Sequence, residues 1–325
     1  MADSKPQVTN DPVISPVESI IYKTQREIKP YIFKRLENAS PKIPAKKIAR
    51  TITITSGKGG VGKTNIVANL AICLGQAGRK VIILDADLGL ANIDVVFGIR
   101  PKRTLVDVIK NNLSMEEVLL PGPFGIKIIA GGSGILELAQ LSLEHFRRLL
   151  DQMRFLEGIA DYLLIDTQAG ISQNVVSFCQ AADQVIVVTN PEPTALADAY
   201  GIIKIISRSN QLANVWVLVN QATQEQEAGF IFDRLNNVAV DFLQFPLRNL
   251  GYIPFDRHVF QAVCKQVPFM LFAPLCPAAL GIKKVVSEAF NETVAQVEPG
   301  GIEGFMKKLS GFFSRGADTS PGEES

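Results

Sequence analysis

The chain has 325 residues, 47% of them hydrophobic, and a formal net charge of +1 at pH 7. This length accommodates two domains, or one α/β domain of about 250 residues with tails, and the near-zero charge excludes a global attraction to nucleic acid or anionic lipid. The sequence has no apolar run of the roughly 18 residues that a membrane span needs and no signal-like N-terminus, so we expect a cytoplasmic protein.

Residues 1–47 are expected to form a flexible basic arm. The first part is rich in Asp, Ser and Pro, and residues 23–50 contain nine Lys or Arg against two Glu. Such a segment is typically solvated or bound to a partner; direct contact with nucleic acid or lipid is the alternative.

The stretch 51–64 predicts a strand that leads into a phosphate-binding loop. Five alternating β-branched and hydroxyl residues precede a match to G-x-x-x-x-G-K-[ST]. Its glycines let backbone N–H groups surround phosphate oxygens at a helix N-terminus, Lys63 would neutralise the β- and γ-phosphates, and the Thr64 hydroxyl would ligate Mg²⁺. The predicted ATP-binding residues of this loop are Gly57, Lys58, Gly59, Gly60, Val61, Gly62, Lys63 and Thr64.

Two carboxylates follow the next predicted strand, residues 80–84. Ligands of doubly wound sheets bind beyond the carboxyl ends of the strands. We therefore expect Asp85 to face the Mg²⁺ shell and Asp87 to position the water that attacks the γ-phosphate. The alternative is that both aspartates cap the following turn.

A second acidic strand end lies about 100 residues after the loop. Residues 105–118 read as helical pieces, 126–130 as a strand and 143–156 as a helix, and the apolar run 162–165 then ends in Asp166. A carboxylate at the end of a buried strand suits a hydrogen bond to Mg²⁺-bound water, which is the Walker B pattern.

Further strands are expected at residues 184–189, 215–220 and 251–256. A helix that runs to Ser209 is expected after Pro193-Thr194, which reads as its N-cap. Strands that alternate with helices predict an α/β fold over residues 48–298, a doubly wound, mostly parallel sheet with helices on both faces.

Residues 299–325 predict a short amphipathic helix followed by a disordered tail. Bulky apolar residues recur on one face, with Lys307, Lys308 and Arg315 beside them. This pattern favours binding in a membrane interface; packing of the stripe on the protein's own core is the alternative. The stripe consists of Ile302, Phe305, Met306, Leu309, Phe312 and Phe313.

Neither the cysteines nor the histidines show the spacing of a metal site. Single cysteines in apolar surroundings predict buried thiols in a reducing compartment, and no cysteine stands where an iron–sulfur cluster would need it. His145 and His258 are expected to be structural. The cysteines are Cys73, Cys179, Cys264 and Cys276.

The segment Lys58–Thr64, K-G-G-V-G-K-T, resembles the deviant Walker A motif of the MinD/ParA superfamily of ATPases. The resemblance implies that Lys58 reaches the ATP of the partner in a nucleotide-sandwiched homodimer; a solvated loop lysine is the alternative. It also implies that Asp85–Gly89 and Asp166–Gly170 are switches I and II, and that Asn220 and Pro254 contact adenine; the alternative is that both merely end strands.

Four motifs together with the C-terminal helix resemble the FlhG family, also called FleN or YlxH. This resemblance implies an ATP-hydrolysing, ATP-dependent dimerising switch that regulates the number and placement of flagella, peripheral on the inner face of the cell membrane. It implies an FlhF-type GTPase and a flagellar C-ring protein as partners, and no nucleic acid. The motifs are Asp85–Asp94, Gly131–Ile135, Asp166–Ser172 and Asn190–Tyr200.

Two features depart from that family. Gln168 stands where a glycine is usual, and the N-terminal arm has no clear D-Q-A-x-x-L-R element, the segment by which the family stimulates its GTPase. The alternative functions are division-site selection of the MinD type and partitioning of DNA or cargo of the ParA type.

Overall fold

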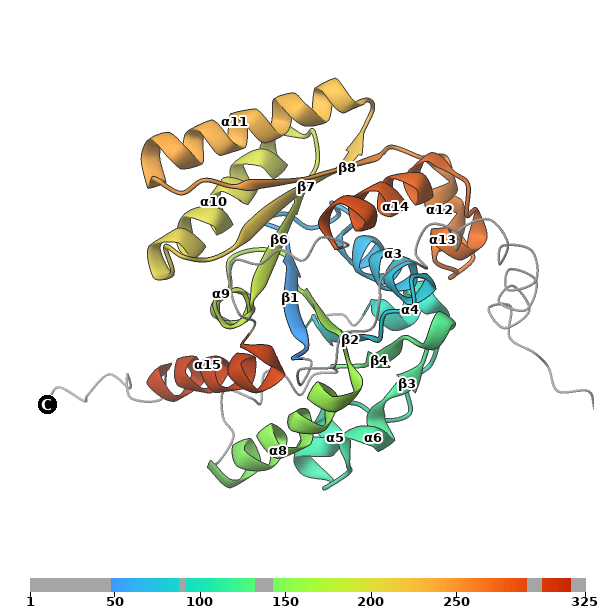
Figure 1. Ribbon diagram of the computed structural model, residues 1–325, viewed down its shortest axis with the longest axis vertical. Coiled ribbons are helices and arrows are strands. Elements are labelled where there is room, and N and C mark those ends of the chain that lie inside the picture. The colour runs from blue at the N-terminus through green and yellow to red at the C-terminus, as the bar shows by residue number, and fades with distance from the viewer. Residues whose placement is uncertain (1–47, 88–91, 132–142, 291–299, 317–325) are drawn as a thin grey trace, which may run out of the picture. The chain divides into compact units, whose positions relative to one another are not determined.

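The computed structural model describes residues 48–87, 92–131, 143–290 and 300–316. These residues form one eight-stranded sheet with the strand order β3-β4-β2-β5-β1-β6-β7-β8 (Figure 1). All neighbouring strands are parallel except β3 and β4, which pair antiparallel. Helices cover both faces, so the predicted fold class is confirmed.

The strands occupy Arg50–Thr55 (β1), Val81–Ala86 (β2), Leu120–Pro121 (β3), Lys127–Ile129 (β4), Tyr162–Thr167 (β5), Gln184–Thr189 (β6), Val215–Ala222 (β7) and Arg248–Pro254 (β8). The helices occupy Lys63–Gln76 (α3), Ile93–Phe97 (α4), Leu105–Lys110 (α5), Met115–Val118 (α6), Leu143–Ile159 (α8), Gln173–Ala181 (α9), Pro193–Ser209 (α10), Glu225–Leu243 (α11), Arg257–Cys264 (α12), Phe269–Phe272 (α13), Pro277–Ala289 (α14) and Gly301–Gly316 (α15), and a 3₁₀ turn (η2) spans Pro123–Gly125.

The central strands are buried on both faces, as their β-branched composition requires. β2 and β6 are buried at every position, and β1 and β5 at all but their first residue. Parallel sheets need this covering, because crossover helices lie on both sides of the strands. The loops at the carboxyl ends of β1, β2 and β5 are thereby held side by side.

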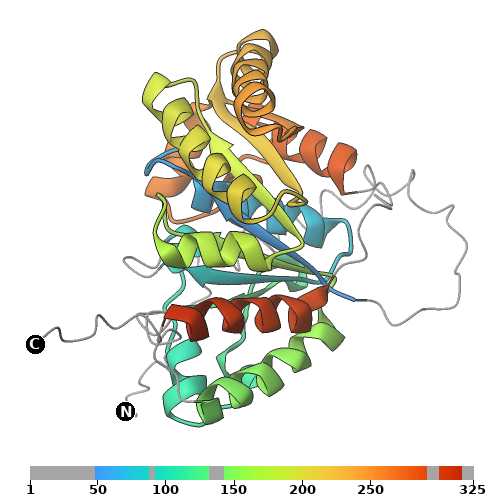
Figure 2. The ribbon, with the colours of Figure 1, turned by 90° about the vertical axis from the view of Figure 1, so that its left-hand side faces the viewer.

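The C-terminal helix α15 packs against the sheet instead of presenting its apolar stripe to the outside. It lies between α8 and α9 (Figure 2). The Phe305 ring stacks on Phe178 of α9 with 6.1 Å between ring centroids. The buried members of the stripe, each at most 3% exposed, are Ile302, Phe305, Met306 and Leu309.

The expectation that these four residues face lipid is therefore wrong for this conformation, and packing on the protein's own core is what the structure shows. The physical reason is that a one-sided apolar stripe satisfies a membrane interface and a hydrophobic core equally well. The side chains of Phe312 and Phe313 lie outside the described residues. Within the described ranges, no helix is both long and apolar enough to cross a bilayer.

Two carboxylates anchor the beginning of α15 to the beginning of β1. Glu157, near the end of α8, accepts the N–H groups of Ile302 and Ala49, each at 2.6 Å. Asp183 accepts N–H groups from Gly300 at 2.7 Å and Thr51 at 2.9 Å. These bonds satisfy amides that a helix N-terminus leaves unpaired, and the negative charges complement the helix dipole.

Replacing Phe305 by Ala should lower the free energy of unfolding by roughly 3–5 kcal/mol, because it leaves a cavity against Phe178 and removes a fully buried ring. Urea denaturation of the full chain measures this loss. Lys308→Ala is the matched control on the exposed face of the same helix and should change stability by less than about 0.5 kcal/mol. Equal stability of Phe305→Ala and the unsubstituted chain would show that α15 does not dock in solution.

Candidate functional site

The loop between β1 and α3 has the shape that phosphate binding requires. Gly60 and Gly62 have φ values of +81° and +89°, a left-handed conformation that favours glycine. Helix α10 and strand β7 also approach the glycines closely. A Cβ added to Gly57 would lie 2.1 Å from the carbonyl oxygen of Asp198, and one on Gly62 would lie 2.4 Å from Nδ2 of Asn220.

Lys63, Thr64 and Asp166 converge behind this loop. The Lys63 Nζ atom lies 3.3 Å from Oδ1 of Asp166, and the two side chains are only 8% and 1% exposed. The Thr64 hydroxyl is hydrogen-bonded to the same carboxylate. The lysine and hydroxyl of the P-loop are thus placed beside the carboxylate of the Walker B strand, as the sequence predicts.

Asp85 lies next to Asp166, because the two residues are register partners on β2 and β5. Asp85 is 2% exposed and accepts N–H groups from Asp87, Asn92 and Ile93 at 3.1–3.3 Å. Its hydrogen bonds match the alternative reading, in which the aspartate caps the following turn. Asp87 lies at the exit from β2, immediately before the undescribed residues 88–91.

Burial disfavours the ionised form of both carboxylates, and the nearby positive charge does not fully compensate for it. Burial, and next the neighbouring carboxylate of Asp166, raise the pKa of Asp85 to about 7, although backbone hydrogen bonds from Asp87 and Ile93 oppose the shift. Burial also raises the pKa of Asp166, although Lys63 and Thr64 act against this. Carboxylate and hydroxyl oxygens are the donors that Mg²⁺ prefers, so Thr64, Asp85 and Asp166 fit a magnesium ion.

Lys58 is held within its own chain. Its ammonium group forms an ion pair with Glu192 and a 2.8 Å hydrogen bond with Oγ1 of Thr194, both at the beginning of α10. Glu192 in turn accepts a hydrogen bond from the Asn190 side chain at 3.2 Å. Lys58 is therefore a paired lysine of the loop, and its action on a partner's ATP stays a prediction. The role of Glu192 was not predicted, although it belongs to the quoted motif Asn190–Tyr200.

Asn220 supports the P-loop. Its Nδ2 donates to the backbone oxygen of Val61 at 2.7 Å, and the side chain is 7% exposed. Asn220 and Pro254 do line one cavity of about 570 Å³ beside Gly62. Two aromatic residues of the cavity wall were not predicted: Phe255 and Phe260, which are 63% and 73% exposed. Exposed aromatic residues directly after a strand that ends at a ligand edge are the signal that could have found them.

Switch II contacts the P-loop through its backbone. The N–H of Gly170 donates to the backbone oxygen of Ser56 at 2.9 Å. Gln168 donates to Oγ of Ser172, the N-cap residue of α9, at 2.7 Å. The unusual glutamine thus stabilises the turn that follows Asp166.

The predictions for the cysteines and histidines need two corrections. Cys264 is exposed at the end of α12, whereas the other three cysteines are buried as predicted. His258 does have potential ligand partners, because Asp256 and Cys276 lie beside it in space. The spacing in the sequence could not show this, because Cys276 lies 18 residues after His258, directly before another helix, α14. The side chain of His145 lies outside the described residues.

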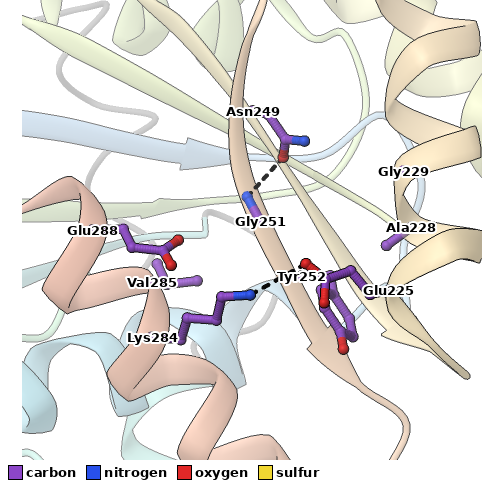
Figure 3. A pocket seen from close by; sticks show the side chains of 9 residues that line it. All are labelled: Glu225, Ala228, Gly229, Asn249, Gly251, Tyr252, Lys284, Val285 and Glu288. Carbon is purple, nitrogen blue, oxygen red and sulfur yellow. Dashed lines mark hydrogen bonds and ion pairs between the residues drawn. The ribbon is translucent and has the colours of Figure 1, made fainter.

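A separate hollow of about 360 Å³ lies at the edge strand β8, between α11 and α14 (Figure 3). The ion pair between Lys284 and Glu225, 3.3 Å long, connects the two helices across it. The N–H of Gly251 is satisfied by the Asn249 side chain at 2.8 Å. Charged groups and satisfied amides protect an exposed sheet edge from pairing with other chains. None of the predicted site residues lines this hollow.

The raised pKa of Asp85 predicts that the nucleotide-free chain loses stability as the pH rises. The pKa is about 7 in the folded state and 3.8 as the ordinary value, so the folded state binds more protons between these limits. The free energy of unfolding should therefore fall between about pH 4 and pH 7. Urea denaturation at pH 5.5 and pH 7.5 measures the fall. Asp85→Asn should reduce it, and an unchanged fall in that variant would refute the assignment.

Comparisons with known proteins agree with this geometry. Residues 47–290 match a family model described as ParA: NUBPL iron-transfer P-loop NTPase. The chain is 40% identical to the antiactivator FleN of Pseudomonas aeruginosa, over 80% of this chain and 93% of FleN. It is 34% identical to the flagellum site-determining protein YlxH of Helicobacter pylori, over 81% of this chain and 88% of YlxH.

A similar solved structure is that of the septum site-determining protein MinD from Pyrococcus horikoshii, in complex with Mg-ADP. It has a TM-score of 0.59 and 28% sequence identity, and the match covers 75% of this chain and 97% of MinD. A P-loop on β1, buried carboxylates on β2 and β5, and these similarities lead to one conclusion: the chain belongs to the MinD/ParA family of P-loop ATPases.

Proposed function

We propose that this protein is a Mg²⁺-dependent ATPase that dimerises when it binds ATP and regulates the number and placement of flagella. The observation that carries the biochemical part is the group of Lys63, Thr64, Asp85 and Asp166 behind the P-loop. The flagellar part is supported by the similarity to FleN and YlxH, whose names describe an antiactivator and a determinant of flagellum site.

Different residues of the chain have different roles in ATP hydrolysis. Backbone N–H groups of residues 57–64 bind the phosphate oxygens, and Lys63 turns from Asp166 toward the β- and γ-phosphates. Asp87 orients the attacking water, and Gly170 brings switch II to the γ-phosphate through its contact with Ser56. Bound Mg²⁺ would neutralise developing charge on the phosphates, held by Thr64, Asp85 and Asp166.

Lys58 completes the site of the second chain. Its ion pair with Glu192 is partly exposed, at 34% for the lysine and 57% for the glutamate. Water screens an exposed ion pair, so breaking this pair costs little. The γ-phosphate of the partner's ATP therefore competes readily for the lysine. Hydrolysis removes that phosphate, and Lys58 can return to Glu192.

Membrane contact requires α15 to leave the core. Each of the four buried apolar side chains is worth roughly 1.5–3 kcal/mol when removed from water, so the helix does not expose them freely. A lipid interface buries the same face of the helix and so offsets its exposure, whereas the core surface that α15 leaves, including Phe178, becomes exposed. Dimerisation offsets this remaining cost, because two helices bind one membrane with avidity.

The partners that fit this function are an FlhF-type GTPase and a protein of the flagellar C-ring. Division-site selection is the second candidate, since the similar structure from Pyrococcus horikoshii is a septum site-determining protein. The higher identity to FleN and YlxH, 40% and 34% against 28%, favours the flagellar function. Capture of a purified C-ring protein, tested against a purified division inhibitor, distinguishes the two.

Lys58→Ala should abolish ATP-dependent dimers and leave ATP binding within about threefold of the original, because Lys63 and the loop amides remain. Light scattering after size exclusion measures the dimer, and a fluorescent ATP analogue measures binding. Lys63→Ala is the contrasting variant and should lose both. Dimers of Lys58→Ala at the original ATP concentration would refute the action of Lys58 across the interface.

Anionic liposomes should bind the full chain with ATP and release it with ADP. Lys308→Glu should weaken this binding by roughly tenfold or more, since each cation near an anionic surface contributes about 1 kcal/mol. This residue is exposed, so the variant leaves the core of α15 intact. Lys308→Arg is the matched control. Equal sedimentation with ATP, ADP and no nucleotide would refute a membrane contact that depends on nucleotide.

A further inference from the structure

Three side chains with different ligand atoms meet where α12 and α14 begin. Asp256 follows β8 and caps the N-terminus of α12, His258 lies in the first turn of α12, and Cys276 precedes α14. Nδ1 of His258 lies 2.8 Å from Oδ1 of Asp256, and one ligand atom from each of the three residues lies within 4.8 Å of the other two. Tetrahedral metal bonds of about 2.0–2.3 Å place ligand atoms about 3.3–3.8 Å apart, a spacing that small side-chain rotations reach here.

The aspartate is held in place and ionised. Its side chain is 4% exposed and accepts the N–H of His258 at 2.9 Å and that of Ala278 at 3.0 Å. Burial by itself would raise the pKa of Asp256, but these two hydrogen bonds, together with those of the Cys276 and His258 side chains, outweigh it and lower the pKa to about 2. The carboxylate is therefore already ionised, and a metal ion would replace its contacts with the two other side chains.

The cysteine sulfur lies beside Asp256 at the beginning of α14. Cys276 is 6% exposed, and the nearby backbone N–H groups of Ala279 and Ala278 act to lower the pKa of its thiol. Burial raises the pKa of the thiol to about 11, so the free chain keeps the proton, which it donates toward Asp256. A metal ion displaces such a proton when it binds, because a coordinated thiol ionises.

We propose that Asp256, His258 and Cys276 bind a zinc ion. A donor set of one sulfur, one nitrogen and one oxygen suits Zn²⁺ and not Mg²⁺ or Ca²⁺, which prefer oxygen. The His258 side chain is 51% exposed, so solvent supplies the fourth ligand. This site shares no residue with Thr64, Asp85 and Asp166, the oxygen donors behind the P-loop.

Zinc at this place would influence the nucleotide site. Asp256 and its neighbour Arg257 line the 570 Å³ cavity together with Asn220 and Pro254. A metal that joins the start of α12 to the start of α14 would fix this wall of the cavity. The effect on nucleotide affinity rests on the proposed function, whereas zinc binding itself does not, so the two can fail separately.

The test uses the untagged full chain after removal of metals by a chelator. Competition with a chromophoric zinc chelator should give one Zn²⁺ per chain, and Co²⁺ should produce the near-ultraviolet charge-transfer band of a cobalt–thiolate bond. Cys276→Ser should remove the band, and His258→Ala should weaken zinc binding at least roughly tenfold, since loss of even an outer partner costs that much. The half-exposed His258 keeps the second variant free of core disruption.

Matched controls are available for both ligand types. Cys264→Ser replaces the exposed thiol of α12, and His145→Asn replaces the other histidine; both should keep the cobalt band and the zinc stoichiometry. Absence of stoichiometric zinc, or loss of the band in Cys264→Ser with retention in Cys276→Ser, would overturn the proposal. In that case Asp256 only caps the two helices through hydrogen bonds.

Discussion

The structure depends on one electrostatic arrangement: two buried carboxylates, Asp85 and Asp166, lie side by side, and the buried ammonium group of Lys63 pairs with Asp166. β2 and β1 both pair in parallel with β5, so the carboxyl ends of the three strands lie at the same edge of the sheet. The loop after β1 leads directly into α3, which therefore begins beside both carboxylates. The long apolar strands, the glycines of the loop and the covering helices all serve this placement. The uneven charge makes the site receptive to a cation and to phosphate.

Much of this site could be predicted because its chemistry is local in the sequence. The glycines, Lys63 and Thr64 form a continuous motif, and Asp85 and Asp166 each end an apolar run whose period identifies a strand. The strand at 184–189 was predicted with its observed bounds, and the following helix ends at Ser209 as predicted, although its N-cap is Glu192 and not Pro193-Thr194. The start of β8 was placed three residues too late, because Asn249 and Gly251 form an irregularity in its pairing with β7.

Other features could not be predicted because they arise from the tertiary structure. The apolar period of α15 describes the helix correctly but does not distinguish a lipid surface from the face between α8 and α9. The hydrogen-bonded partners of Lys58 lie more than 130 residues away, and the sequence gives no distance between them. The same holds for Cys276, which reaches His258 only because α12 and α14 begin side by side.

The shared anchor at Glu157 has a consequence for how α15 can move. One carboxylate binds the amide of Ala49 before β1 and the amide of Ile302 in α15. Loss of the second contact leaves a charged oxygen and a backbone donor without partners, together with an exposed Phe178. These costs arise at once, and fraying from the C-terminal end recovers none of them. If α15 leaves the core as proposed, we therefore expect it to leave as one unit.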